Sequence, residues 1–266
     1  MTETALADLD LIREAAIVAG EMAVGFRTAG LERHDKADGS PVTNADLAVD
    51  AYLRTTLMAA RPDYGWLSEE TADDPARLSR QRVFIVDPID GTRAYIRDKP
   101  WWGVSIAVVE NGRPIAGVVA APDRGEVFEA TAGGGARMNG QPIVCSDALD
   151  LEGSAMLADL AMLKHPAWPT PWPEMRVESR NAIAYRLCSV ACGDVDAMLA
   201  LSPKNEWDMA AGDLIAVEAG CLVTDHQGRP LGYNQPKPVS ASLVCAGPAL
   251  HRLILSRTQP IDLPDG

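Results

Sequence analysis

The sequence predicts a mixed α/β fold, and three observations support this interpretation. Apolar residues recur at helical spacing over residues 5–26. Residues 66–130 change to short runs rich in β-branched and aromatic side chains, with turn signals between them. Helical patterns return over residues 181–201 and 208–219. The chain therefore mixes both kinds of secondary structure, and it shows no internal repeat.

The first half is predicted to contain a second helix and then a series of strands. Thr43 and Asp46 form a capping-box pattern, which predicts a helix that stops by Pro62. Asn111-Gly112 predicts a hairpin turn between two strands. The predicted strands of this half cover residues 66–68, 83–86, 104–109, 115–120 and 126–130.

Prolines and tryptophans crowd residues 166–173, which are predicted to form a surface loop because proline cannot donate to a sheet ladder. The sequence indicates no role for this loop. The remaining elements of the second half are helices over residues 181–201 and 208–219 and strands over residues 222–224 and 243–245. With 266 residues, 47% of them hydrophobic, the chain is long enough for two joined halves, which we place at residues 1–142 and 143–266.

Composition excludes several classes of function. The net charge of −13 argues against a nucleic-acid polymer as partner, because the surface repels phosphate backbones. The amino terminus lacks the basic region, apolar stretch and cleavage site of a secretory signal. The longest uncharged apolar run, residues 101–109, is far shorter than the roughly 20 residues that span a bilayer. We therefore expect a cytoplasmic protein with no membrane partner, whose five cysteines are reduced thiols.

The most informative segment, residues 83–92, is an apolar run that ends in two carboxylates. Pro88 favours an extended conformation for Asp87, so we expect Asp87 at the end of a strand. Residues 90–92 follow where a helix would begin, with free amides available to a phosphate. Hard oxygen ligands of this kind suit magnesium. The alternative is purely structural, with Asp90 as a helix cap and Asp87 as a strand end.

Two further acidic segments strengthen the prediction of a metal site. Glu69 and Glu70 follow another short apolar run, and Asp208 lies where a helix begins. Either segment alone is more typical of a solvated surface or a helix cap. Their combination with Asp87 and Asp90 indicates a shared site.

Four blocks in chain order resemble the signature of the inositol monophosphatase superfamily. They are Lys36-Ala-Asp-Gly-Ser-Pro-Val-Thr43-Asn-Ala-Asp46, Ser68-Glu69-Glu70, Asp87-Pro-Ile-Asp90-Gly-Thr92 and Trp207-Asp208-Met-Ala-Ala-Gly212. The resemblance spans residues 36–233. It implies a layered α/β/α/β/α sandwich of the inositol monophosphatase or sugar phosphatase type, with an antiparallel sheet in the first half and the active site between the halves. Members are commonly homodimers, so a homodimer is a further expectation.

The resemblance also implies two to three Mg²⁺ ions and inhibition by Li⁺, which competes for one magnesium position. Glu69, Asp87 and the backbone carbonyl of Ile89 would hold one ion. Asp87, Asp90 and Asp208 would hold a second, so that Asp87 bridges the pair. Glu69 would also help to position a third, weaker ion. Such a pair stabilises the attacking and leaving oxygens of an in-line displacement.

The nucleophilic water would be held by Thr92 and Asp46 as a hydrogen-bonding dyad. The backbone amides of Gly91 and Thr92 would receive the phosphate oxygens and their charge. The resemblance therefore implies a small phosphate monoester as substrate, cleaved by metal-activated water without a covalent phosphoenzyme.

Three features resemble the 3'(2'),5'-bisphosphate nucleotidase branch, which hydrolyses 3'-phosphoadenosine 5'-phosphate to AMP and phosphate. They are Leu67-Ser-Glu69-Glu70, Ala121-Pro122 and Pro203-Lys-Asn205-Glu-Trp207-Asp208. In this branch Arg186 or Lys204 would meet the second phosphate. The sequence departs from the branch at residues 93–95, where Arg-Ala-Tyr replaces Lys-Glu-Phe.

Two alternatives remain open. An inositol 1-monophosphatase or a related sugar phosphatase is the first, although Leu201 stands where the inositol branch carries an acid that grips inositol hydroxyls. A non-catalytic metal- or phosphate-binding regulator on the same fold is the second. All six expected side chains are nevertheless present, namely Asp46, Glu69, Asp87, Asp90, Thr92 and Asp208.

Overall fold

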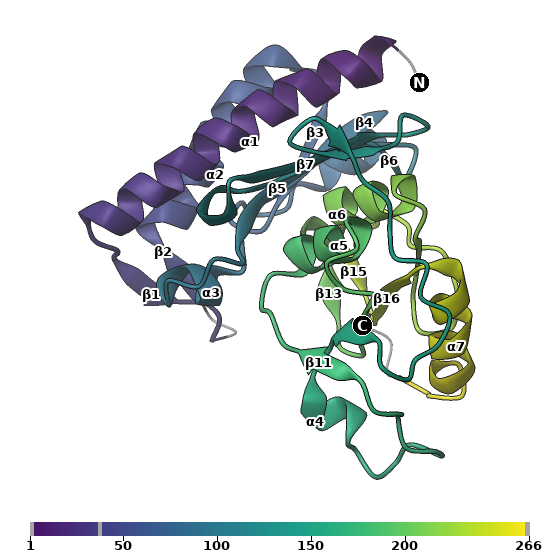
Figure 1. The fold of residues 1–266 in the computed structure, drawn as a ribbon. Coiled ribbons are helices and arrows are strands. Elements are labelled where there is room, and N and C mark those ends of the chain that lie inside the picture. The colour runs from purple at the N-terminus through teal and green to yellow at the C-terminus, as the bar shows by residue number, and fades with distance from the viewer. Residues whose placement is uncertain (1–2, 37–38, 264–266) are drawn as a thin grey trace.

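The computed structural model describes residues 3–36 and 39–263, whose elements stack in five layers (Figure 1). Two long helices form the first layer, and a seven-stranded sheet forms the second. A central pair of helices separates this sheet from a five-stranded sheet, and further helices cover the outer face of that second sheet. This arrangement confirms the predicted layered α/β/α/β/α sandwich.

The first sheet contains seven strands in chain order, because each strand pairs with the next one along the sequence. Only β3 and β4 run parallel, and all later neighbours are antiparallel. Asn111 and Gly112 both have positive φ, which confirms the tight turn between β5 and β6. The strands are β3 (Gly65–Ser68), β4 (Arg82–Asp90), β5 (Gly103–Glu110), β6 (Arg113–Ala121), β7 (Glu126–Thr131), β8 (Ala136–Met138) and β9 (Gln141–Pro142). The five predicted strands are all confirmed.

The helices α1 (Glu3–Ala29) and α2 (Asn44–Ala60) cover one face of the first sheet and confirm the two predicted helices (Figure 1). Small side chains let α1 lie close to the sheet, since Ala16, Ala19 and Ala23 are completely buried. They share a hydrophobic core with alternate side chains of β4 and β5. No described helix, α1 included, is long and apolar enough to cross a membrane.

The central helices α5 (Ile183–Ala191) and α6 (Glu206–Glu218) lie between the two sheets. Glycine permits their close approach, because a Cβ on Gly117 of β6 would lie 3.1 Å from the backbone of α6. A Cβ on Gly212 of α6 would lie 2.8 Å from a leucine side chain of α5. The second half of the chain therefore packs directly on the first sheet, and we propose that the halves meet after β9.

The second sheet has the order β11-β10-β12-β16-β14, so its strands come from widely separated parts of the chain. Met198 and Ala200 face the central helices, whereas Ala197 and Leu199 face the outer layer. The outer layer contains α4 (Leu160–Leu163) and α7 (Pro248–Thr258). The strands are β10 (Ala155–Leu157), β11 (Arg176–Glu178), β12 (Ala197–Ala200), β14 (Leu222–Thr224) and β16 (Leu243–Ala246).

Several short elements connect the layers. A two-stranded sheet precedes α2, and another pairs the segment before α6 with a later strand. One short helix follows β4, and two 3₁₀ turns lie in the first half. These elements are β1 (Arg33–Asp35), β2 (Pro41–Thr43), β13 (Lys204–Asn205), β15 (Val239–Ser240), α3 (Thr92–Ile96), and the 3₁₀ turns Pro75–Ser79 and Pro122–Arg124.

The prediction of a single helix over residues 181–201 is wrong. α5 ends at Ala191, and Gly193 follows with φ 73°, a left-handed conformation that stops the helix. The Ala-Met-Leu-Ala segment then forms β12 between β10 and β16, because burial on both faces outweighs its helix propensity. The predicted helix at 208–219 and both short strands are confirmed, the loop at 166–173 is irregular as predicted, and α7 was not predicted.

A buried pair in the central layer makes stability depend on pH. Asp213 of α6 accepts a hydrogen bond from the Tyr233 hydroxyl at 2.7 Å, and burial raises the pKa of Asp213 to about 6. A carboxyl whose pKa is raised in the folded state costs stability as pH rises from its ordinary pKa to the raised one. We expect Asp213→Asn to reduce the change in unfolding free energy with pH by up to about 3 kcal/mol, at about 1.4 kcal/mol per pKa unit.

Urea denaturation of both proteins between pH 4.5 and 7 measures this difference. The wild type should lose more unfolding free energy than the variant over this range. The exposed Asp150→Asn is the matched control and should follow the wild type. Parallel pH profiles for wild type and Asp213→Asn would contradict the assignment.

Candidate active site

The end of β4 delivers two carboxylates through an irregular stretch of strand. The strand does not end at Asp87, as expected from Pro88, but continues to Asp90 with a shift of register between these two aspartates. Asp87 Oδ1 accepts the backbone amide of Ile89 at 3.0 Å. The Ile89 side chain is buried in the core beneath α1 and α2, which fixes the position of its backbone carbonyl.

Asp90 joins the two halves of the molecule. Its Oδ1 accepts the amide of Ile183 at 2.8 Å, and its Oδ2 accepts the amide of Tyr185 at 3.1 Å. Both amides belong to the first turn of α5, where backbone N–H groups lack helical partners and the helix dipole is positive. The side chain of Asp90 is therefore held in one orientation by the second half of the chain.

Gly91 occupies a position that no other residue fits. Its φ of 86° is left-handed, and a Cβ there would lie 2.8 Å from the Cβ of Ala182. Gly91 also caps α3, because its carbonyl accepts the amides of Ala94 and Tyr95. The chain can therefore turn from β4 into α3 only with glycine at this position.

Asp46 and Thr92 meet although 46 residues separate them. Asp46 Oδ2 accepts the amide and the hydroxyl of Thr43 at 2.8 and 2.6 Å, as the capping pattern predicts. Its Oδ1 lies 3.2 Å from the Thr92 hydroxyl, which is also 3.2 Å from the carbonyl of Ile89. Burial raises the pKa of Asp46. The predicted dyad is thus in hydrogen-bond contact.

Glu69 enters the site from the end of β3. The ammonium of Lys36 lies 2.7 Å from Glu69 and 2.8 Å from Glu70, so it bridges both carboxylates. Burial and the neighbouring charge of Glu69 raise the pKa of Glu70 to about 7, although Lys36 opposes this shift. The sequence block that starts at Lys36 also contains Ala37 and Asp38, which lie outside the described residues.

Asp208 comes from the second half of the chain. It is the third residue of α6, and its Oδ2 accepts the amide of Asn205 at 3.0 Å. Because α6 packs on the first sheet, this carboxylate reaches the same cavity as Glu69, Asp87 and Asp90. The cavity has a volume of about 680 Å³. It is further lined by Ser40, Pro41, Gly91, Thr92, Arg93, Asp159, Ser179, Arg180, Asn181, Ile183, Arg186, Ser202, Pro203 and Lys204.

The carboxylates of this cavity repel one another. Burial, followed by the charges of Glu69, Asp90 and Asp208, raises the pKa of Asp87 well above its usual range. Burial and the charge of Asp208 raise the pKa of Asp90, and burial with Glu69 raises that of Asp208 to about 7. A positive charge between these groups would relieve the repulsion.

The donor set fits magnesium better than a softer metal. Every predicted side-chain ligand is a carboxylate oxygen, and no His or Cys lines the cavity. In the described part of the chain, no three acidic, His or Cys side chains close around a single point. A closed protein cage is not what this ion requires, because Mg²⁺ usually keeps several waters and takes one or two carboxylates together with substrate phosphate.

The same cavity is also lined by cations. Arg186 and Lys204, both predicted as substrate contacts, line it. Arg93 and Arg180 also line the cavity, and sequence reasoning assigned them no role. Arg93 was noted only as a departure from a family motif, and no motif surrounds Arg180.

Comparison with known proteins agrees with this arrangement. The model of the inositol monophosphatase family matches residues 3–262. The chain belongs to this family. The predicted fold and the predicted family are both confirmed.

Several relatives carry different names. Nus factor SuhB of Pasteurella multocida is 32% identical over 259 residues, 92% of this chain and 94% of the relative. Histidinol-phosphatase of Chlorobaculum parvum is 33% identical over 230 residues, 84% of this chain and 87% of the relative. The 3'(2'),5'-bisphosphate nucleotidase CysQ of Escherichia coli is 33% identical over 252 residues, 85% and 94% of the two chains.

A solved structure has the same fold. The extragenic suppressor protein SuhB of Bartonella henselae has a TM-score of 0.80 at 26% identity, covering 95% of this chain and 98% of that chain. Because relatives of similar identity bear the names of different activities, membership in the family defines the phosphatase class and leaves the substrate open.

Gly91→Ala should lower stability and abolish phosphatase activity. The substitution places a Cβ against Ala182 in a left-handed backbone conformation, which costs about 1 to 3 kcal/mol for the strain alone. The matched control is Gly125→Ala, which has φ 64° but nothing within 4 Å of the added Cβ. Thermal denaturation should show a larger drop in Tm for Gly91→Ala than for the control. Equal drops would contradict the role of the Ala182 contact.

Asp208→Asn should make the Tm of the protein nearly independent of magnesium. The amide oxygen can still accept the Asn205 amide, but the charge that repels Asp87 and Asp90 is gone. Without metal, the Tm of the variant should therefore equal or exceed that of the wild type. Saturating Mg²⁺ should raise the wild-type Tm by roughly 5 to 10 °C and leave the variant nearly unchanged.

Thermal scans at pH 7.5 with EDTA and with Mg²⁺ test this expectation. Asp150→Asn, an exposed acid, is the control and should keep the full magnesium response. A variant that retained the wild-type response would show that Asp208 is not a metal ligand.

Proposed function

We propose that the protein is a magnesium-dependent phosphomonoesterase that hydrolyses 3'-phosphoadenosine 5'-phosphate to AMP and phosphate. The proposal rests on a cavity that contains both acidic and basic side chains. The acidic side chains include the predicted magnesium ligands, and the basic ones are Arg93, Arg180, Arg186 and Lys204. A substrate with two phosphate groups would complement both the ligands of a metal ion and the cations.

The observation that carries the proposal is the state of Arg186. Its side chain is almost entirely buried, at 8% exposure, and burial lowers its pKa to about 10. It pairs with no carboxylate of the described residues, and its Nε has no hydrogen-bond acceptor among them. Its Nη2 donates only to the carbonyls of Leu157 and Leu199, at 2.6 and 3.4 Å.

A buried guanidinium without a counter-charge is costly, because burial strips water from the charge. A second phosphate on the substrate would supply the missing charge and a bidentate acceptor. The charge of Asp90 acts on Arg186, and both residues line one cavity, so the cation lies beside the predicted metal site. Arg186 is thus placed to bind one phosphate while the carboxylates act on the other.

Two of the other cations of the cavity are already engaged. Lys204 donates to the Ser202 hydroxyl and carbonyl and to the Pro203 carbonyl. Arg180 donates to Asp194 and Glu178 and lies over the ring of Trp101. We therefore assign the second phosphate to Arg186 rather than to Lys204.

The proposed reaction consumes one water and breaks the bond between phosphorus and the 3' oxygen of the ribose. Bound Mg²⁺ would lower the pKa of the attacking water and neutralise charge on the phosphoryl oxygens. Thr92 would hold this water, because it lines the cavity and its hydroxyl, which donates to Asp46, can still accept a hydrogen bond from the water. Asp46 would orient Thr92 and favour loss of a proton from the water.

Positioning of the phosphate would fall to the turn between β4 and α3. The amides of Gly91 and Thr92 lie at the start of α3, and neither residue carries a side chain that blocks the cavity. Backbone amides at this point can donate to phosphoryl oxygens. Hydrolysis would then need no covalent intermediate on the chain.

An inositol phosphate or sugar phosphate is the second candidate substrate. The relative named histidinol-phosphatase shows that names within the family refer to different substrates. The position of Leu201 counts against inositol. Leu201 packs against the outer core of the second sheet and does not line the cavity. A polyol bound there would lack the acidic partner at this position.

The relative rates of hydrolysis test the substrate assignment. With Mg²⁺, kcat/KM for 3'-phosphoadenosine 5'-phosphate should exceed that for inositol 1-phosphate by at least about tenfold, the ratio expected from one added charge-assisted hydrogen bond. Arg186→Met should raise KM for the bisphosphate by about tenfold or more. It should leave hydrolysis of inositol 1-phosphate within about twofold, because that substrate has no second phosphate.

Arg180→Met is the matched control, since Arg180 lines the same cavity but already has two carboxylate partners. Its effect on KM should be the smaller of the two. Faster hydrolysis of inositol 1-phosphate than of the bisphosphate would reverse the substrate assignment. Absence of any magnesium-dependent hydrolysis would favour the alternative that the protein is a non-catalytic metal- or phosphate-binding regulator.

A further inference from the structure

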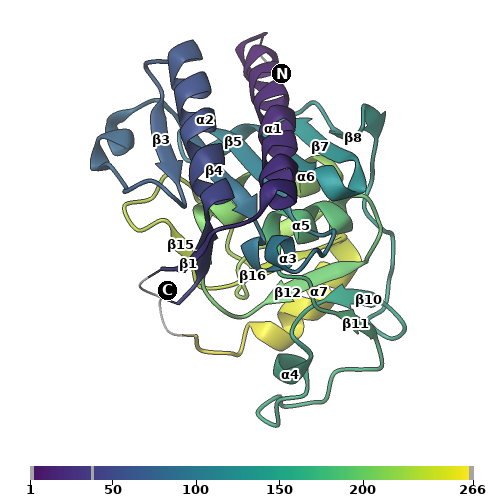
Figure 2. The same cartoon turned by 90° about the vertical axis from the view of Figure 1, so that its left-hand side faces the viewer.

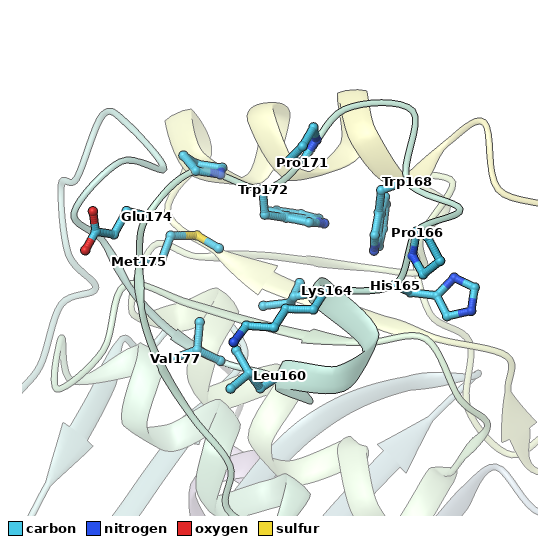
Figure 3. A pocket seen from close by; sticks show the side chains of 12 residues that line it. Leu160, Lys164, His165, Pro166, Trp168, Pro171, Trp172, Glu174, Met175 and Val177 are labelled. Atoms are coloured by element: carbon cyan, nitrogen blue, oxygen red, sulfur yellow. The ribbon is translucent and has the colours of Figure 1, made fainter.

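A second cavity lies in the outer layer of the molecule and is not part of the phosphatase site. It has a volume of about 540 Å³, within the range of small-molecule sites. It is formed by α4, the loop at 166–173 and β11, at the end of the molecule away from the amino terminus of α1 (Figures 1 and 2). Its lining residues are Leu160, Leu163, Lys164, His165, Pro166, Trp168, Pro171, Trp172, Pro173, Glu174, Met175 and Val177 (Figure 3).

Two tryptophans form one side of this cavity. The rings of Trp168 and Trp172 are 5.1 Å apart and perpendicular, with an interplanar angle of 88°. The Nε1 of Trp168 donates to the carbonyl of Met162 at 2.7 Å, which fixes that ring. Edge-to-face contact holds the two rings at a defined angle. This side of the cavity is therefore an aromatic surface whose rings are held in place.

One face of the Trp172 ring is already covered. The guanidinium of Arg257, on α7, lies 5.0 Å from its centroid, and the same guanidinium donates to the carbonyl of Pro171. Figure 3 shows Leu160 and Val177 on the side of the ring opposite α7. The cavity therefore meets the second face of Trp172, and a flat ring of van der Waals thickness could stack there.

The cavity also contains one cation. Figure 3 shows the side chain of Lys164 extending beneath Trp172, with its ammonium near Leu160 and Val177. No acidic side chain among the described residues forms an ion pair with Lys164. The carboxylate of Glu174 lies at the edge of the cavity and points outward in the same view. A ligand in this cavity would therefore meet one aromatic face on which to stack and one ammonium with which to pair.

We propose that this cavity binds a small planar aromatic anion, such as an aryl carboxylate. The aromatic part would stack on the second face of Trp172 and contact Met175 and Val177. The anionic group would pair with the ammonium of Lys164. The site is distinct from the cavity of the predicted metal ligands, because the two cavities share no lining residue.

Isothermal titration calorimetry with 2-naphthoate, compared with the neutral 2-naphthamide, tests this site in the full chain. The wild type should bind naphthoate more tightly than naphthamide. Trp172→Leu should weaken binding of both ligands by about tenfold, because stacking is lost. Lys164→Met should weaken naphthoate by about fivefold and leave naphthamide unchanged.

Two controls localise the effect. Lys99→Met removes an exposed lysine outside the cavity, and Arg186→Met removes one of the cations of the phosphatase site. Both should bind naphthoate as the wild type does. The proposal is overturned if wild-type protein shows no saturable binding at millimolar naphthoate, if naphthamide binds equally well, or if Lys164→Met retains the wild-type affinity. Because Lys164 is exposed, its variant remains informative even if Trp172→Leu fails to fold.

Discussion

The attachment of Asp90 to the first turn of α5 is the constraint on which the rest of the site depends. A carboxylate at the end of an irregular strand accepts two amides from the other half of the chain. Gly91 must then pass close to Ala182, and α5 must pack on α6, which carries Asp208. The same contact therefore fixes the strand, the turn and the relative position of the two helices. Without it, the carboxylates of the two halves would not share a cavity.

This constraint also explains the electrostatic character of the cavity. Burial of several carboxylates beside one another raises their pKa values, and the helix terminus offsets only part of this cost. In the same cavity, Arg186 is buried and pairs with no carboxylate of the described residues. The acidic and the basic groups are thus each unfavourable by themselves, and under the proposed function each would be complemented when a metal ion and a substrate with two phosphates bind. Sites of this kind are stabilised by what they bind.

The parts of the fold that the sequence predicted are those with local causes. The capping pattern of Thr43 and Asp46 and the turn at Asn111-Gly112 depend on neighbours in the chain, and both are present. The prediction of a helix through β12 was wrong because tertiary contacts determine this segment. As a strand between β10 and β16, the segment buries both of its faces. The amide partners of Asp90, 93 and 95 residues away, have no local signal. Nor did any pattern place Trp172 beneath Arg257.

The order of strands in the second sheet has a consequence for synthesis of the chain. β16, which is the last of the described strands to be made, lies between β12 and β14 and pairs with both. The first sheet consists of successive neighbours and can form as it leaves the ribosome, whereas the second must wait for residue 246. The central core, which supports α6 and its Asp208, is therefore completed late. A nascent chain interrupted before β16 would carry a finished first sheet and an unfinished catalytic cavity.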